Sequence, residues 1–196
     1  MSIAVALVPN KASAAEKEHP KFDLAPAVSY ASHQTSEKVT IGASVYDSAE
    51  KAKAAFGKLN PYQYGITPVL VVIQNDSGKT IQLERMRVDY VAPDGAHVDA
   101  TPAADVRYLR GPVNPQTVPS TPIPRLGKHK NPLDAWEIEG RAFSAKVIPA
   151  GESAGGFFYF QTGYQVNSRL YVTGIQEAGS GRELLYFEFP LKDDPQ

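Results

Sequence analysis

The stretch "PVLVVIQNDSGKTIQL", residues 68–83, decides the fold class of this chain. Residues 69–73 are continuously apolar and mostly β-branched, which is the pattern of a strand buried on both faces. Residues 75–78 supply the Asn, Asp, Ser and Gly that favour a tight turn. Apolar character returns at Ile81 and continues to Tyr90, so we expect a second strand over 81–90. A strand, a turn and a strand predict antiparallel β structure.

The same pattern recurs along much of the chain. Further strands are predicted over residues 38–46, 137–147, 155–162, 170–176 and 183–190. Short strands at this spacing, separated by glycine turns, indicate an immunoglobulin-like antiparallel β-sandwich. One short helix is expected over 47–57, with Asp47 as N-cap, Glu50 completing a capping box and Gly57 as the stop. A second helical piece is expected to start at Thr101 and Pro102.

Two segments of the chain, one at its N-terminus and one inside the domain, do not show the strand pattern. Residues 1–36 lack periodicity, and we interpret them as a tail or signal-peptide remnant followed by an extended arm. Residues 37–192 then form a single β-sandwich domain. Within it, residues 111–133 hold six prolines, which cannot donate hydrogen bonds to a sheet, so this segment is expected to be a long surface loop.

Composition excludes several classes of function. The chain has 196 residues and a formal net charge of −1, which argues against a broad electrostatic grip on nucleic acid or on an anionic membrane. It has no cysteine, so disulfides and zinc–thiolate sites are excluded. No apolar run approaches the ~18 residues that a membrane span needs. The histidines are scattered, and we predict neither a metal nor another cofactor.

The N-terminus carries a possible export signal. A short apolar run over residues 3–8 is followed by Pro9 and by Ala12-Ser13-Ala14, a small-x-small pattern of the type that signal peptidase cuts. The basic segment that normally precedes such a run is missing. We therefore expect a periplasmic or secreted protein, with an Ala-rich tail on a cytoplasmic protein as the alternative.

Residues 151–156, GESAGG, contain the G-x-S-x-G pattern of a nucleophile elbow around Ser153. An elbow needs a helix after the serine, whereas residues 157–160 are four aromatics in a row, which favour a strand. In the enzymes that use this elbow the catalytic histidine follows the serine, but all four histidines of this chain precede Ser153. We interpret the motif as a turn and expect no enzymatic activity.

Two groups of residues are candidates for binding. The Pro-rich loop and its start carry basic side chains without acidic neighbours, a possible site for an anionic partner: Arg110, Arg125, Lys128, His129 and Lys130. The alternative is a solvated connector. Tyr62, Tyr64 and Trp136 would form an aromatic platform for a sugar if exposed, or pack at the rim of the sandwich if not.

Three pieces of the chain carry a resemblance. They are residues 68–83, the "YVAPDG" of 90–95 and the "VIPAGESAGGFFYF" of 147–160. Together they resemble telokin-like, immunoglobulin-fold domains of unknown function in bacterial exported proteins, over roughly residues 66–190. The resemblance implies an immunoglobulin-like sandwich and an exported setting, and it transfers no catalytic residue. The predicted helix at 47–57 and the Pro-rich loop depart from that pattern.

The hypothesis that follows is a non-enzymatic exported β-sandwich module that binds a protein or a component of the cell envelope. The alternative is a carbohydrate- or anion-binding domain that uses the basic loop and exposed tyrosines, and a serine hydrolase is the third reading. Ser153 beside a base would favour the hydrolase, and a groove lined by Tyr or Trp would favour a sugar. An apolar or edge-strand patch would favour the binding module.

Overall fold

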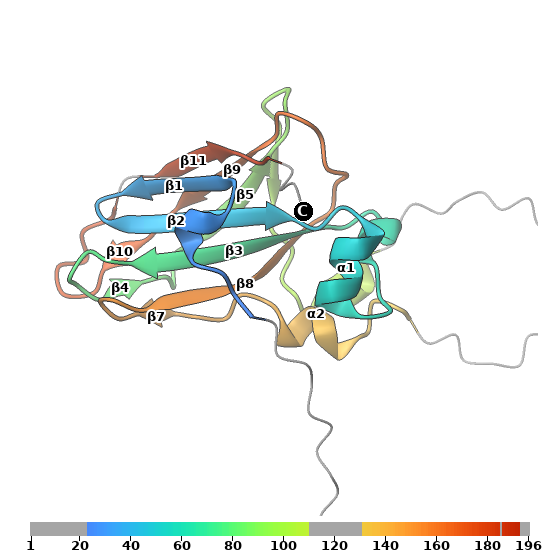
Figure 1. The fold of residues 1–196 in the computed structure, drawn as a ribbon, viewed down its shortest axis with the longest axis horizontal. Helices are drawn as coiled ribbons and strands as arrows, with labels where there is room; N and C mark the ends of the chain where they lie inside the picture. Colours follow the sequence, from blue (N-terminus) through green and yellow to red (C-terminus); the bar gives the residue numbers. More distant parts are fainter. Residues whose placement is uncertain (1–22, 110–130, 185, 193–196) are drawn as a thin grey trace, which may run out of the picture.

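The computed structural model describes residues 23–109, 131–184 and 186–192 of the chain. They form a mostly β fold of packed antiparallel sheets with two short helices, as predicted (Figure 1). The first sheet, called the β3 sheet, has the order β1 (Ser32–Ser36), β2 (Val39–Val45), β3 (Thr67–Asn75), β8 (Ser153–Phe160). The second, the β5 sheet, has the order β11 (Phe187–Pro190), β9 (Arg169–Thr173), β5 (Arg87–Val91), β6 (His97–Asp99). A small third sheet joins β10 (Gln176–Glu177), β4 (Ile81–Gln82) and β7 (Val147–Ile148).

Strand β3 is buried on both faces, because a second sheet covers one face of the β3 sheet and helices cover the other. Val69, Val71 and Ile73 of β3 point into the core shared with the β5 sheet. Leu70 and Val72 point the other way, into a second core. The continuous apolar run of β3 is therefore the signature of a doubly covered strand, as the sequence predicted.

Two helices supply the second cover: α1 (Ala49–Phe56) and α2 (Trp136–Gly140), which lie beside one another at one end of the sheet (Figure 1). Phe56 of α1 and Ile138 of α2 are buried in the helix-side core. The aromatic run of β8 divides between the two cores as its alternation predicts. Phe157 and Tyr159 pack on the helix side, and Phe158 and Phe160 pack on the sandwich side.

Helix α1 lies where it was predicted but begins one residue later. Ser48, and not Asp47, is the N-cap, and its hydroxyl accepts a hydrogen bond from the backbone N–H of Lys51 at 3.2 Å. The helix ends at Gly57 as expected, because Gly57 adopts φ +64°, which glycine reaches without strain.

Four predicted strands are wrong in extent, and the one predicted over 183–190 forms only as β11, Phe187–Pro190. The strand predicted over residues 137–147 is replaced by α2 and irregular chain, and only β7 remains at its end. The strands predicted over 81–90 and 170–176 each break into two, β4 with β5 and β9 with β10. The helical piece expected at Thr101 is instead an isolated bridge to Tyr159, and the 3-10 helix η3 (Val106–Tyr108) forms further on.

The N-terminal boundary of the domain also needs correction. The predicted arm over residues 1–36 contains the 3-10 helix η1 (Ala27–Ser29) and strand β1, and Ala27 is fully buried. Strand β1 pairs with β2 over its whole length and lies against β11. The folded unit therefore begins before residue 37, and residues 1–22 lie outside the described part.

Candidate functional site

The GESAGG segment is a turn that leads into a strand. Ser153 is the first residue of β8 and lies opposite Gln74 of β3. The turn before it is held by Asn75, whose carbonyl accepts from Gly151 N at 2.7 Å and whose N–H donates to Glu152 O at 3.0 Å. Gly151 has φ +81°, the left-handed conformation that favours glycine. A strand, and not the helix of an elbow, follows the serine.

The two adjacent glycines at the end of this segment, Gly155 and Gly156, have a packing role. A Cβ on Gly156 would lie 2.5 Å from both Cα and N of Phe143, and one on Gly155 would lie 2.8 Å from Leu24 Cδ1. The chain at residues 141–143 runs along β8, with Phe143 N donating to Phe157 O at 3.1 Å and Phe157 N donating to Arg141 O at 2.8 Å. Gly156 lets this segment approach β8.

Neither histidine within the described residues lies beside Ser153. His33 is on β1, and strands β2 and β3 separate β1 from β8. His97 is on β6 of the other sheet, where Nδ1 lies 3.2 Å from the Asp89 carboxylate. His19 and His129 lie outside the described residues. The geometry therefore offers Ser153 no described histidine as a base.

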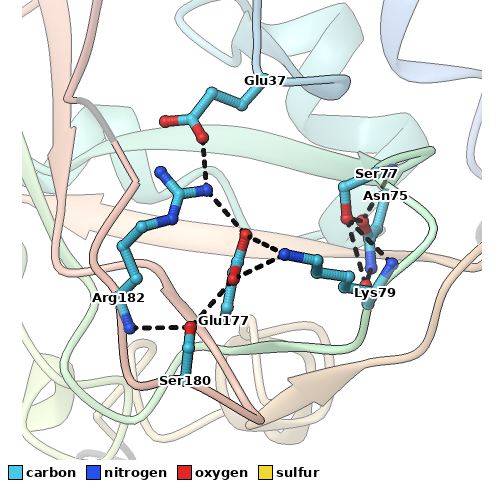
Figure 2. A network of polar contacts seen from close by, with 7 residues as sticks. All are labelled: Glu37, Asn75, Ser77, Lys79, Glu177, Ser180 and Arg182. Atoms are coloured by element: carbon cyan, nitrogen blue, oxygen red, sulfur yellow. Dashed lines mark hydrogen bonds and ion pairs between the residues drawn. The ribbon is translucent and has the colours of Figure 1, made fainter.

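A polar network occupies the end of the sandwich where three turns meet (Figure 2). The Glu177 carboxylate accepts from Lys79 Nζ at 3.0 Å, from Arg182 Nη2 at 2.6 Å and from Ser180 Oγ at 2.8 Å. Arg182 also pairs with Glu37 at 2.6 Å, which ties in the turn between β1 and β2. These donors, Arg182 first and then Lys79, lower the pKa of Glu177 from 4.5 to about 2.

Asn75 anchors the same end of the molecule. Its side chain is fully buried, and Nδ2 donates to the carbonyls of Lys79 at 2.7 Å, Ile148 at 3.0 Å and Pro149 at 3.0 Å. Its Oδ1 accepts from Ser77. Because both Asn75 and Glu177 are saturated by partners from neighbouring turns, we interpret this end of the sandwich as a structural clamp.

The predicted basic site lies outside the described residues, since Arg110, Arg125, Lys128, His129 and Lys130 all fall within 110–130. Arg107, just before it, is described. Its guanidinium pairs with Asp134 at 3.0 Å and with Glu139, so Arg107 links η3 to α2 and to the residues just before it. The anion site therefore stays a prediction.

The predicted aromatic platform is divided between two elements. Tyr62 and Tyr64 are half-buried on the 3-10 helix η2 (Pro61–Tyr64), and Tyr64 packs against the helix-side core. Trp136 opens α2 and is 40% exposed, with the Arg141 guanidinium carbon 6.0 Å from its ring centroid. Tyr64 therefore takes part in rim packing, and a sugar platform at these three residues stays a prediction.

A crevice of about 510 Å³ opens on the side of the sandwich where β5 and β8 face each other. Its lining comes from β5, from the chain after β6, from residues 142–143 and from β8: Met86, Arg87, Val88, Asp89, Asp99, Ala100, Thr101, Pro102, Ala103, Ala142, Phe143, Phe157, Phe158 and Tyr159. Phe143 stacks on Phe158 with ring centroids 5.3 Å apart and planes at 26°. With Met86 and Val88, these rings give the crevice an apolar floor.

A second hollow adjoins the crevice and shares Met86, Phe143 and Phe158 with it. Its outer part is polar, with Glu84, Ser144 and Lys146 in its lining. The apolar floor thus continues along the open side of the sandwich and ends among charged side chains.

Backbone hydrogen bonds fix the walls of the crevice. Thr101 N donates to Tyr159 O at 2.7 Å, which joins the chain after β6 to β8, and the 141–143 segment is bonded to β8 as described above. The Tyr159 hydroxyl donates to Ile138 O at 2.7 Å. Burial raises the pKa of Tyr159 well above its usual range, with Arg141 opposing the shift, so this phenol stays protonated and serves as a structural donor.

The crevice is the candidate binding site of the described residues. Its volume is within the range of ~300–1,000 Å³ that small-molecule sites occupy, and its apolar floor lies beside a rim that includes Arg87, Asp89 and Asp99. Sequence reasoning missed it, because its lining is drawn from four separate segments. Among the described residues no group of three or more His, Cys, Asp or Glu side chains is placed to hold a metal ion. No helix in residues 23–109, 131–184 or 186–192 is long and apolar enough to cross a membrane.

Comparison with known proteins identifies no family for this chain. No family model matches the chain, and no curated protein matches it. Among solved structures it is similar to MPT63, a secreted protein from Mycobacterium tuberculosis. The identity is 15%, the match covers 80% of this chain and 89% of that chain, and the TM-score is 0.34. A superposition this loose identifies neither a family nor a function.

Proposed function

We propose that this protein is a non-enzymatic binding module that works outside the cytoplasm and holds an apolar part of a protein or envelope component in the crevice. The observation that carries the proposal is the apolar floor of Phe143, Phe158, Met86 and Val88 inside a hollow of about 510 Å³. Burying an apolar group there is favourable by roughly 25 cal/mol per Å² of surface removed from water.

The rigidity of the walls supports the same function. Thr101 and Phe143 are each held to β8 by a backbone hydrogen bond, so the hollow exists before any ligand arrives. A preformed site loses little conformational entropy on binding, which favours affinity. The charged rim residues Arg87, Asp89 and Asp99 then orient the bound group.

The extracellular setting is supported by the sequence alone. Ala12-Ser13-Ala14 has the pattern of a signal-peptidase site, although it lies outside the described residues. If the site is used, the mature protein made by its native host begins at Ala15, and mass spectrometry of the intact protein will show that mass. An intact N-terminus on a protein recovered from the cytosol would contradict export and leave the crevice proposal standing.

Binding in the crevice is tested by nuclear magnetic resonance titration with three probes: indole, naphthalene-2-sulfonate and octanoate. We expect at least one of them to shift the amide signals of Ala100, Thr101 and Ala142, which line the hollow. The variant Ala103→Phe places a ring against the crevice and should abolish those shifts. If it does not fold, Ala103→Val narrows the same space more gently.

Ala104→Phe is the matched control, since Ala104 is the exposed neighbour and lies outside the lining. It should bind the probes like the unmodified protein. The proposal is overturned if none of the three probes shifts the lining residues, or if the shifts persist when Ala103 is enlarged.

A further inference from the structure

The outer face of the β5 sheet carries three aromatic rings in a row, well separated in sequence. The rings of Tyr171 and Tyr186 have centroids 5.6 Å apart with planes at 40°, and those of His97 and Tyr171 are 5.7 Å apart with planes at 81°. We call these three residues the tyrosine row. Tyr186 is 55% exposed, His97 is exposed and Tyr171 is half-buried between them.

Strand register places these side chains on one surface. In β9, Leu170 and Val172 are buried, so Tyr171 between them points to the outer face. Tyr171 lies opposite Asp89 on one side and opposite Glu188 on the other. In β6, His97 and Asp99 lie on either side of the half-buried Val98 and are exposed, so they also face outward. The row therefore runs diagonally across the sheet, because His97 is level with Arg169 and not with Tyr171.

The charges beside the row are largely paired. His97 Nδ1 lies 3.2 Å from the Asp89 carboxylate, and Arg169 Nε lies 3.2 Å from the Glu188 carboxylate. Asp99 lies opposite Asp89 and adds a further carboxylate to this face. A surface with paired cations and a slight excess of carboxylates repels polyanions and offers acceptors to hydroxyl groups.

We propose that the tyrosine row binds a chain of an uncharged glycan. The apolar C–H face of a sugar ring packs against an exposed tyrosine ring, and the hydroxyls at its edge donate to carboxylates such as Asp89 and Glu188. The occupant suits the surface because it combines apolar ring faces with hydroxyls and carries no charge. None of the three ring residues lines the crevice, although Asp89 and Asp99 belong to both its rim and this face.

The tilt between the two tyrosine rings defines the form of the glycan. The ring planes of Tyr171 and Tyr186 meet at 40° and are not coplanar. Successive sugar rings must therefore rotate relative to one another to contact both tyrosines. A soluble, twisted chain can do this, whereas the flat face of a crystalline polysaccharide cannot. The proposal therefore specifies a soluble polysaccharide.

Affinity electrophoresis in gels that contain laminarin, mannan, soluble starch or hydroxyethyl cellulose tests the proposal, with dextran sulfate as the polyanion. We expect at least one uncharged polysaccharide to retard the protein and dextran sulfate not to. Tyr186→Ala should weaken that binding on the order of 10-fold, the equivalent of the stacking energy of one ring. Its melting temperature should change little, because Tyr186 is more than half exposed.

Tyr108→Ala is the matched control, since Tyr108 is 76% exposed on η3 and lies outside the tyrosine row. It should be retarded like the unmodified protein, and so should a folded Ala103→Phe, since Ala103 lines the crevice and packs against the helix-side core, away from the tyrosine row. The proposal is overturned if none of the four uncharged polysaccharides retards the protein, if dextran sulfate alone does, or if Tyr186→Ala binds as well as Tyr108→Ala.

Discussion

Gly156 and Phe143 are in backbone contact: a Cβ on Gly156 would lie 2.5 Å from the Phe143 Cα. Phe143, which contributes to the floor of the crevice, can lie this close to β8 because Gly156 has no side chain. We expect Gly156→Ala to destabilise the fold by about 1–3 kcal/mol, the usual cost of overpacking, when unfolding by urea is measured. Gly179→Ala is the control, because nothing lies within 4 Å of its Cβ position. Equal stability of the two variants would contradict this account of Gly156.

The Asn75 side chain should be hard to replace, because it donates to three carbonyls and is fully buried. Asn75→Asp removes both donor hydrogens and puts a carboxylate against those carbonyls, so we expect a loss of at least about 2 kcal/mol in the free energy of unfolding. Gln74→Ala is the control, since that neighbour bonds only Asp76 at an exposed position. A loss in Asn75→Asp no larger than in the control would show that the clamp contributes nothing.

Acid should weaken the clamp through Glu177. The folded pKa of Glu177 is lowered from 4.5 to about 2, so the carboxylate form stabilises the fold above pH 4.5 and this contribution disappears as the pH falls toward 2. We expect the melting temperature of the unmodified protein to fall through this window more steeply than that of Glu177→Gln. Glu152→Gln, in an exposed turn, should follow the unmodified protein. If the melting temperatures of Glu177→Gln and of the unmodified protein fall in parallel between pH 4.5 and 2, the Glu177 carboxylate is not the source of the acid sensitivity.

We expect the Ser153 hydroxyl to show no enhanced nucleophilic reactivity. It opens a strand and neither described histidine is within reach, so Ser153→Ala should leave any background esterase activity unchanged and cost at most ~1 kcal/mol of stability. A fluorophosphonate probe followed by mass spectrometry gives a second measurement, with no label expected on Ser153. Labelling of this residue would restore the hydrolase reading.

The sequence predicted well those elements whose hydrophobic pattern fits only one type of secondary structure. The uninterrupted apolar run of β3 and the four consecutive aromatics of β8 could be assigned to strands without tertiary information. The segment that became α2, WEIEG, alternates apolar and acidic residues over too few positions to separate a strand from a helix turn. Its two glutamates favour a helix, and the burial of Ile138 in the helix-side core stabilises the helical conformation.

The candidate sites were beyond sequence analysis for a different reason. The crevice exists because Thr101 and Phe143 both bond to β8, contacts between segments far apart in the chain. The tyrosine row depends on the order of strands in the β5 sheet, which places β9 beside β5 and β11. Tyr171 could be named as an exposed-aromatic candidate, but its partners Tyr186 and His97 follow only from that order.

Strand β1 meets β11 along a seam held partly by side chains, with Glu188 N donating to Gln34 Oε1 and Lys192 N donating to Ser32 Oγ, both at 2.7 Å. These bonds join residues 154 and 160 positions apart. During synthesis β1 is made long before its cover exists, and the edge of the first sheet stays open until β11 has been added. An unfinished chain therefore presents an uncovered strand edge on which the edge strand of another copy can pair.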